Sequence, residues 1–87
     1  IITDDNPRFE NPKKIRDDMV HNIKLEDLKK IKVIGNREIA IKKAINFLTE
    51  QDVLLIAGKG HENYQLIGNK KKFFSDKITA KEYLRKK

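Results

Sequence analysis

Three apolar runs along the chain predict strands: Ile1 to Asp4, residues 32–34 and residues 53–57. The last run, Val-Leu-Leu-Ile-Ala, has no polar alternation. Strands that are covered on both faces, as in a parallel sheet, have this composition. The chain also begins inside a strand pattern without a starter Met, so we expect a piece of a larger protein rather than a whole domain.

Helical patterns lie between these runs. Asn11 is placed to cap a helix that has Pro12 at its first position and that ends near Asn22, where a left-handed residue could stop it. Asn36 is placed to cap a second helix that runs to about Glu50. The apolar stripe of this second helix comprises Ile41, Ala44, Ile45 and Leu48.

After residue 57 the pattern changes. Residues 65–75 predict a hairpin that turns near Gly68-Asn69. Residues 79–82, Thr-Ala-Lys-Glu, match a capping box that would start a terminal helix and pack Tyr83 or Leu84. Strands alternating with helices predict an α/β fold. We therefore expect a Rossmann-like, doubly wound sheet, mainly parallel, with a C-terminal hairpin and helix, as an incomplete domain.

A net charge of +7 raises the possibility of nucleic-acid binding. However, 16 of the 20 basic residues are Lys, and Ile, Lys and Asn make up 35 of the 87 residues. That bias is typical of an A/T-rich genome, and no glycine-aromatic or helix-turn-helix pattern accompanies the charge. We expect no nucleic acid as a partner.

Other classes of protein find no support. The chain has no Cys, which excludes disulfides and thiolate metal sites within it. Its two His residues are far apart and lack acidic partners at ligand spacing, so we expect no metal site here. No apolar run reaches the roughly 20 residues of a membrane span. We expect no membrane partner and a cytoplasmic location.

The first polar motif, residues 5–8 (Asp-Asn-Pro-Arg), follows the first strand. All of its residues except Arg8 are ordinary turn residues, so it could be only a turn. Arg8, however, leaves a backbone stiffened by Pro7, and its planar fork suits two-point binding of a carboxylate. Asn6 could assist it, and Asp5 is a further candidate.

The second polar motif, residues 58–62 (Gly-Lys-Gly-His-Glu), follows the third strand. It lacks the phosphate-loop pattern, and Glu62 would repel a phosphate. Gly58 would instead let the backbone approach a ligand whose ammonium Glu62 neutralises. His61 is a weak candidate, because a histidine beside a glycine turn usually makes a structural hydrogen bond. We expect the Lys59 ammonium to stay in solvent.

The ends of neighbouring parallel strands share one crevice, so the two motifs should meet. Together they would bind a zwitterionic amino acid, with Asn6 and Arg8 on a carboxylate and Glu62 on an ammonium. Arg37 also follows a strand end. It most simply starts a helix, although it could reach the same crevice.

At these residues the chain resembles the C-terminal domain of the Mur ligases, most closely the MurE type. The resemblance covers nearly the whole chain in family order. It lies in Thr3-Asp4-Asp5-Asn6-Pro7-Arg8, Arg37, Ala57-Gly58-Lys59-Gly60-His61-Glu62, Tyr64-Gln65, Gly68 and Phe74-Ser75-Asp76.

The resemblance implies an ATP-dependent ligase of peptidoglycan biosynthesis that joins an amino acid to UDP-N-acetylmuramoyl-L-alanyl-D-glutamate. Its Asn-Pro-Arg form implies meso-diaminopimelate, or a close analogue, as the amino acid. Asn6 and Arg8 would then hold the distal end, with Gly58 giving backbone contact and Glu62 binding the ammonium. Lysine lacks the second carboxylate and would leave Arg8 unpaired, so it would be rejected by about 10⁴-fold or more.

Residues 1–87 would form the latter part of the amino-acid-binding domain. The sites for ATP, Mg²⁺ and the nucleotide sugar would lie in central and N-terminal domains outside these residues, so the isolated chain should be inactive and should contribute no catalytic residue. Two rival hypotheses are a non-catalytic α/β module that binds an amino acid or anion, and a basic nucleic-acid-binding domain.

Overall fold

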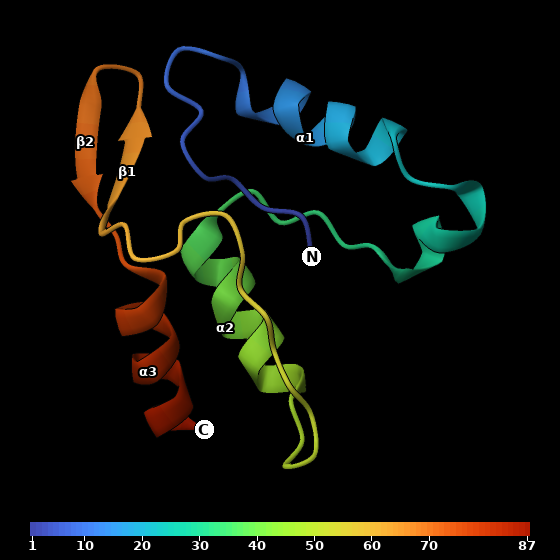
Figure 1. The fold of residues 1–87 in the computed structure, drawn as a ribbon, viewed down its shortest axis with the longest axis vertical. Helices are drawn as coiled ribbons and strands as arrows, with labels where there is room; N and C mark the ends of the chain where they lie inside the picture. The colour runs from blue at the N-terminus through green and yellow to red at the C-terminus, as the bar shows by residue number, and fades with distance from the viewer.

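The computed structural model describes every residue from 1 to 87 and contains three α-helices, a short 3-10 helix and one hairpin (Figure 1). The molecule is flat, with extents of 38 × 36 × 17 Å. None of its helices has the length and apolar character needed to cross a bilayer. In chain order the elements are α1 (Pro12–His21), η1 (Leu25–Lys30), α2 (Arg37–Phe47), β1 (Tyr64–Ile67), β2 (Lys70–Phe73) and α3 (Asp76–Lys86).

Both predicted asparagine caps are confirmed. The Asn11 side chain accepts a hydrogen bond from Lys13 N at 2.9 Å, and the Asn36 side chain accepts one from Ile39 N at 3.0 Å. Each amide oxygen satisfies an N–H group that the first turn of a helix leaves without an intrahelical partner. The starts of α1 and α2 are therefore fixed by local sequence.

The helix ends differ in detail from the prediction. α1 stops before Asn22 as expected, but the φ of Asn22 is −86°, so the left-handed conformation predicted there was wrong. Its N–H is instead satisfied by the carbonyls of Met19 and Val20. α2 ends at Phe47, before the predicted end near Glu50, because residues 49–52 form a separate turn.

The start of the terminal helix was predicted wrongly. α3 begins at Asp76 rather than after Thr79, because the Ser75 side chain accepts a hydrogen bond from Ile78 N at 3.2 Å and so provides the cap. Thr79 is buried inside the helix. Tyr83 packs against the core, as one of the two predicted alternatives.

The predicted hairpin is confirmed. β1 pairs antiparallel with β2, from Tyr64 opposite Phe73 to the turn at Gly68, whose φ is 60°. The other edge of β1 is joined to residue 8: Arg8 N donates to Leu66 O at 3.0 Å, and Gly68 N donates to Arg8 O at 2.6 Å. The hairpin therefore holds the end of the first polar motif.

The hydrophobic core lies where α2 and α3 pack together with the extended segment 53–57 (Figure 1). Ile45 is its most buried residue, with 1 % of its surface exposed. α2, α3 and segment 53–57 all contribute side chains to it, so the core fixes the two helices relative to this segment. The core comprises Ile41, Ile45 and Phe74, with Leu48, Leu54, Ile56, Ala80 and Tyr83 packed against them.

The fold is α/β, but the expected doubly wound, mainly parallel sheet is not formed within these residues. The only sheet is the antiparallel pair β1–β2. Parallel pairing is limited to isolated bridges, between Ile2 and Val33 and between Arg8 and Ile67. Segment 53–57 makes no hydrogen bond between its backbone and the backbone of any other part of the chain. An apolar groove of about 140 Å³ adjoins both this segment and residues 1–3, over α2.

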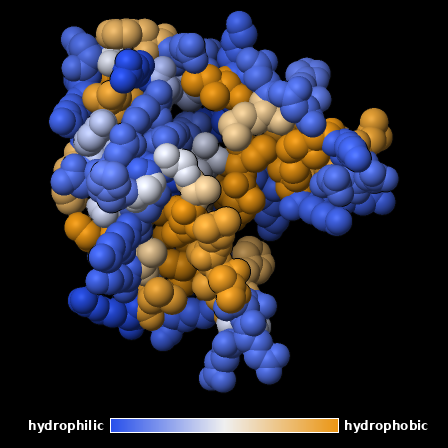
Figure 2. All heavy atoms as spheres, in the orientation of Figure 1, coloured by the Kyte–Doolittle hydropathy of each residue, from blue (hydrophilic) through white to orange (hydrophobic).

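Segment 53–57 is extended, and only one of its faces is covered. Leu54 and Ile56 pack against the core, whereas Val53 is 95 % exposed and Leu55 is 84 % exposed. The prediction that both faces would be covered is wrong within this chain, because nothing packs on the outer face. Figure 2 shows the result as a continuous apolar area on this side of the molecule.

Candidate functional site

The two polar motifs lie together. We call residues 5–8 the first loop and residues 58–62 the second loop. The Lys59 ammonium of the second loop donates to Asp5 Oδ1 of the first loop at 2.6 Å and to Asn6 Oδ1 at 3.3 Å. These atoms belong to residues more than 50 positions apart in the chain. The prediction that the two motifs meet is therefore confirmed.

Lys59 itself contradicts the prediction that its ammonium stays in solvent. Its side chain is 0 % exposed, while that of its partner Asp5 is 36 % exposed. Gly58 and Gly60 on either side have φ angles of 109° and 61°, which L-residues rarely adopt. These angles reverse the backbone around Lys59 and turn its side chain toward the first loop.

Asn6 is held by two donors. Its Oδ1 atom accepts from Leu66 N at 3.0 Å as well as from Lys59. Because both neighbours are obligate donors, the oxygen must face them, and the side-chain NH₂ group must point elsewhere. Next to it, Gln65 Nε2 donates to the Asp5 carbonyl at 2.7 Å. β1 thus holds the backbone and the side chain of the first loop.

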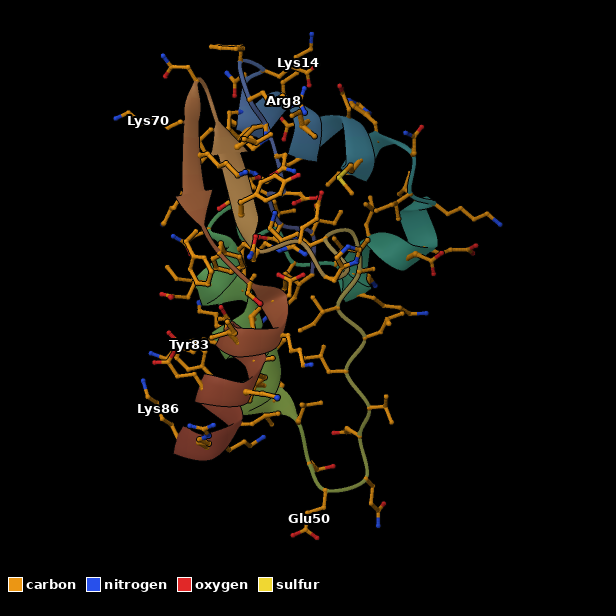
Figure 3. The ribbon with its side chains drawn as sticks, turned by 60° about the vertical axis from the view of Figure 1, so that its left-hand side comes forward. Arg8, Lys14, Glu50, Lys70, Tyr83 and Lys86 are labelled. Atoms are coloured by element: carbon orange, nitrogen blue, oxygen red, sulfur yellow. The ribbon has the colours of Figure 1, made fainter.

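Arg8 combines an exposed side chain with a rigid backbone. It is the only residue other than glycine with a positive φ, at 53°. The two backbone hydrogen bonds to Leu66 and Gly68 hold it in this conformation. Arg8 lies between the hairpin and α1, and its guanidinium forms no hydrogen bond or ion pair within the chain (Figure 3). A free guanidinium on a fixed base can bind an external anion.

Glu62 lies beside Tyr64, whose hydroxyl donates to Glu62 Oε2 at 3.1 Å. This hydrogen bond, together with the negative charge of Glu62, raises the pKa of Tyr64 above its ordinary value of 10.0. The positive charge of Arg8 acts on the same phenol in the opposite direction. The hydrogen bond places the Glu62 carboxylate beside the first residue of β1.

Arg37 lies beneath the loops, and its guanidinium makes several hydrogen bonds within the chain. Its side chain is 4 % exposed and pairs with Asp76 through two hydrogen bonds of 2.7 Å. It also donates to the carbonyls of Asp4 at 3.2 Å and Ala57 at 3.1 Å. The bonds to Asp76 raise the pKa of Arg37 above its ordinary value. Arg37 joins both strand ends to α3, and it also forms part of the wall of the hollow that lies between the loops and α1.

A second ion pair fixes α1 against the first strand end. Arg16 Nη1 lies 2.7 Å from both carboxylate oxygens of Asp4. Gly35 allows this approach, since a Cβ atom there would lie 2.5 Å from Arg16 Nη1. α1 has no buried residue, so this pair is its main polar attachment to the loops.

The predicted site residues fall into two groups. Asp5, Asn6 and Gly58 line a hollow of about 480 Å³ between the loops and α1. Arg8 and Glu62 lie outside that lining: Arg8 is bonded through its backbone to Leu66 and Gly68, and Glu62 is bonded to Tyr64. His61 is exposed and has no polar partner in the chain.

Lys59, Tyr64 and Gln65 also contact the two loops, although the sequence did not predict them as site residues. The sequence does contain a signal for Lys59. If the two loops meet, a lysine between two glycines can turn its ammonium toward the side-chain oxygens of Asp5 and Asn6. Tyr64 and Gln65 were noted only within the family resemblance. Their contacts depend on β1 lying against the first loop, which no local pattern predicts.

Comparisons with known proteins show which proteins this chain resembles. The family described as "Mur ligase, glutamate ligase domain" matches residues 1–60. A curated relative in Rickettsia typhi, named UDP-N-acetylmuramoyl-L-alanyl-D-glutamate--2,6-diaminopimelate ligase, is 52 % identical over 97 % of this chain and 16 % of its own length. A relative of the same name in Bacteroides thetaiotaomicron is 50 % identical over 94 % of this chain and 17 % of its own length.

A solved structure of an enzyme with this name is also similar. It has a TM-score of 0.88 and 36 % identity, over 97 % of this chain and 17 % of that one. The chain therefore spans about a sixth of the length of the relatives and of the solved structure that it matches.

Proposed function

Because the chain belongs to the Mur ligase family, we propose that residues 1–87 are the latter part of the amino-acid-binding domain of an ATP-dependent ligase. In this proposal the enzyme adds meso-diaminopimelate, or a close analogue, to UDP-N-acetylmuramoyl-L-alanyl-D-glutamate during peptidoglycan synthesis in the cytoplasm. The relatives that support it carry this activity in their names.

The observation that carries the proposal is the convergence of the two loops. It gives one region a free guanidinium, at Arg8, and a carboxylate held by a phenol, at Glu62. Diaminopimelate has a carboxylate and an ammonium at its distal end, and these are the groups that Arg8 and Glu62 would bind. The Asn6 NH₂ group would assist at the carboxylate, and Gly58 would allow close approach of the backbone.

The task of this part of the enzyme is to orient the attacking amine. An acyl phosphate formed from ATP reacts with an amine only when the two are close and aligned, and correct orientation supplies roughly 7–11 kcal/mol of the barrier. In this proposal ATP, Mg²⁺ and the nucleotide dipeptide are bound outside residues 1–87. The chain contains neither a phosphate-loop sequence nor a cluster of three potential metal ligands.

The doubly wound sheet belongs to the same proposal. Segment 53–57 is extended, has no backbone partner and exposes one apolar face. Residues 1–3 border the same apolar groove and already pair in parallel at Ile2. In the longer protein, strands from outside residues 1–87 would complete a mainly parallel sheet through these two segments and place α2 on one of its faces.

The deciding experiment uses the whole enzyme with all three substrates. We expect release of phosphate from ATP only when both the nucleotide dipeptide and diaminopimelate are present, with the tripeptide as product. ATP turnover that ignores diaminopimelate would end the proposal. The rival basic domain would instead retard nonspecific DNA in a gel and lose that binding in added salt.

A further inference from the structure

Lys59 is the one buried lysine of this chain. The 15 other lysines are exposed, whereas the Lys59 side chain is 0 % exposed. Burying an ammonium is costly unless charged and polar partners surround it. Because the Lys59 side chain is fully buried, it cannot contact a ligand in the crevice. Its effect on a ligand must pass through the residues that it bonds to.

The neighbours of Lys59 are the residues that shape the site. Its ammonium bonds to Asp5 and Asn6 of the first loop. Its carbonyl accepts from Glu62 N at 3.2 Å, which closes the turn that carries the Glu62 side chain. One residue thus contacts the carboxylate-binding side through its side chain and the ammonium-binding side through its backbone.

The contact with Asn6 has a directional consequence. Lys59 and Leu66 N both donate to Asn6 Oδ1, so the amide oxygen faces inward and the NH₂ group faces away from these donors. An NH₂ group donates to carboxylates, whereas a flipped amide would offer an oxygen and repel them. Lys59 therefore selects the amide orientation that a carboxylate ligand needs.

We propose that Lys59 is a positioning residue, which orients Asn6 and sets the separation of the two loops so that the distal carboxylate of the amino acid is recognised. The inference rests on the proposed function and deepens it. Lys59 contributes to selectivity for a second carboxylate and touches neither the substrate nor the reacting atoms.

The test is Lys59→Met in the whole ligase, because Met is similar in length and suits a buried site, while Asp5 is exposed enough to be solvated. We expect the KM for diaminopimelate to rise about 10- to 100-fold, as for the loss of hydrogen bonds to a charged group. The kcat and the KM values for ATP and dipeptide should change little. Lys77→Met, at an exposed lysine of α3, is the matched control.

Lysine as the amino-acid substrate separates positioning from general damage. Lysine has no distal carboxylate, so Lys59→Met should leave the KM for lysine unchanged. The ratio of kcat/KM for diaminopimelate to kcat/KM for lysine should therefore fall by about 10- to 100-fold. Equal losses for both amino acids, or an unchanged KM for diaminopimelate in a folded variant, would overturn the inference.

Asn6→Asp provides a second route if Lys59→Met does not fold. One carboxylate oxygen still accepts from Lys59 and Leu66 N, so the loop is kept, but the other replaces the NH₂ group and repels the substrate carboxylate. The KM for diaminopimelate should rise while turnover of lysine holds. An unchanged KM for diaminopimelate would mean that the orientation set by Lys59 does not matter. An unmodified enzyme that fails to ligate diaminopimelate would contradict the proposed function itself.

Discussion

Arg8 has a backbone conformation that its residue type does not favour. A φ of 53° costs an L-residue other than glycine about 1–2 kcal/mol. The hydrogen bonds to Leu66 and Gly68 offset this cost, and the side chain gains no partner within the chain in return. Strain of this kind, kept at an exposed charged residue, is typical of a binding site.

Two substitutions at Arg8 distinguish the effect of its side-chain charge on binding from the effect of its backbone conformation on stability. Arg8→Ala and Arg8→Gly both remove the guanidinium, so each should raise the KM for diaminopimelate in the whole enzyme by roughly 100-fold. Glycine also relieves the left-handed conformation, so Arg8→Gly should be about 1 kcal/mol more stable than Arg8→Ala. Steady-state kinetics and urea unfolding measure the two effects. Equal rises in KM for all three substrates would contradict a role in amino-acid binding.

Tyr64→Phe tests whether the phenol holds Glu62. Removing the hydroxyl deletes the 3.1 Å hydrogen bond to the carboxylate. We expect the KM for diaminopimelate to rise about 2- to 10-fold, as for the loss of one ordinary hydrogen bond, and kcat to change little. Tyr83→Phe is the control, because the Tyr83 ring packs on the core away from the loops. The same kinetic change in both variants would count against the role of Tyr64.

Some residues of the two loops could be predicted from the sequence, and others could not. Asn6, Arg8 and Glu62 are predicted as site residues from their polar or charged side chains and from their positions after the predicted strands. The burial of Lys59 was missed because it depends on two positive φ angles and on a loop more than 50 residues away. A hydropathy scale gives every lysine the same value. The burial of Lys59 arises only because the two loops meet around it.

Among the helices and strands, local chemistry predicted the starts of α1 and α2 and the hairpin. The start of α3 was wrong because Ser75 and Thr79 offer the same cap chemistry, and tertiary contacts decide between them. Asp76 pairs with buried Arg37, which requires the helix to begin there. Whether segment 53–57 pairs with other strands and is covered on both faces could not be predicted from its own residues, because both depend on which segments lie beside it.

The turn between α2 and segment 53–57 predicts a dependence of stability on pH. Asp52 Oδ2 accepts from Thr49 N at 2.8 Å and from the Thr49 hydroxyl at 2.9 Å, and these bonds lower the pKa of Asp52 below 3.8. A depressed carboxyl pKa stabilises the fold above the unfolded-state value and loses that effect as the pH falls through the folded-state value.

Asp52→Asn should therefore lower the thermal midpoint of the whole enzyme at neutral pH, and the difference from the unchanged protein should shrink once the pH falls below 3.8. Asp18→Asn is the control, since the Asp18 side chain is exposed and makes no hydrogen bond. Thermal scans across the acid range would measure both. A difference that stays constant to the lowest pH would contradict this assignment.

Across the whole molecule, polar and apolar surfaces are separated. The hairpin and α3 carry many exposed lysines, whereas segment 53–57 and Ile1 expose apolar side chains beside the groove over α2 (Figure 2). Isolated exposed apolar residues are ordinary, but a contiguous area of this kind indicates a surface that another part of a protein covers.

Hydrogen exchange tests the covered surface directly. The amides of segment 53–57 have no backbone acceptor in this chain, so they should exchange rapidly in the separately prepared 87 residues. In the whole ligase they should be protected as in a central strand, because neighbouring strands would supply acceptors. Rapid exchange in both proteins would remove the proposed parallel sheet.

Arg37 ties the assembly of the crevice to the order in which the chain is made. Its guanidinium donates to the carbonyls of residues 4 and 57, and its charge is balanced by Asp76, which follows both loops in the sequence. The contacts that hold the two strand ends therefore depend on a residue that follows both loops in the sequence, so the crevice is complete only once α3 is in place.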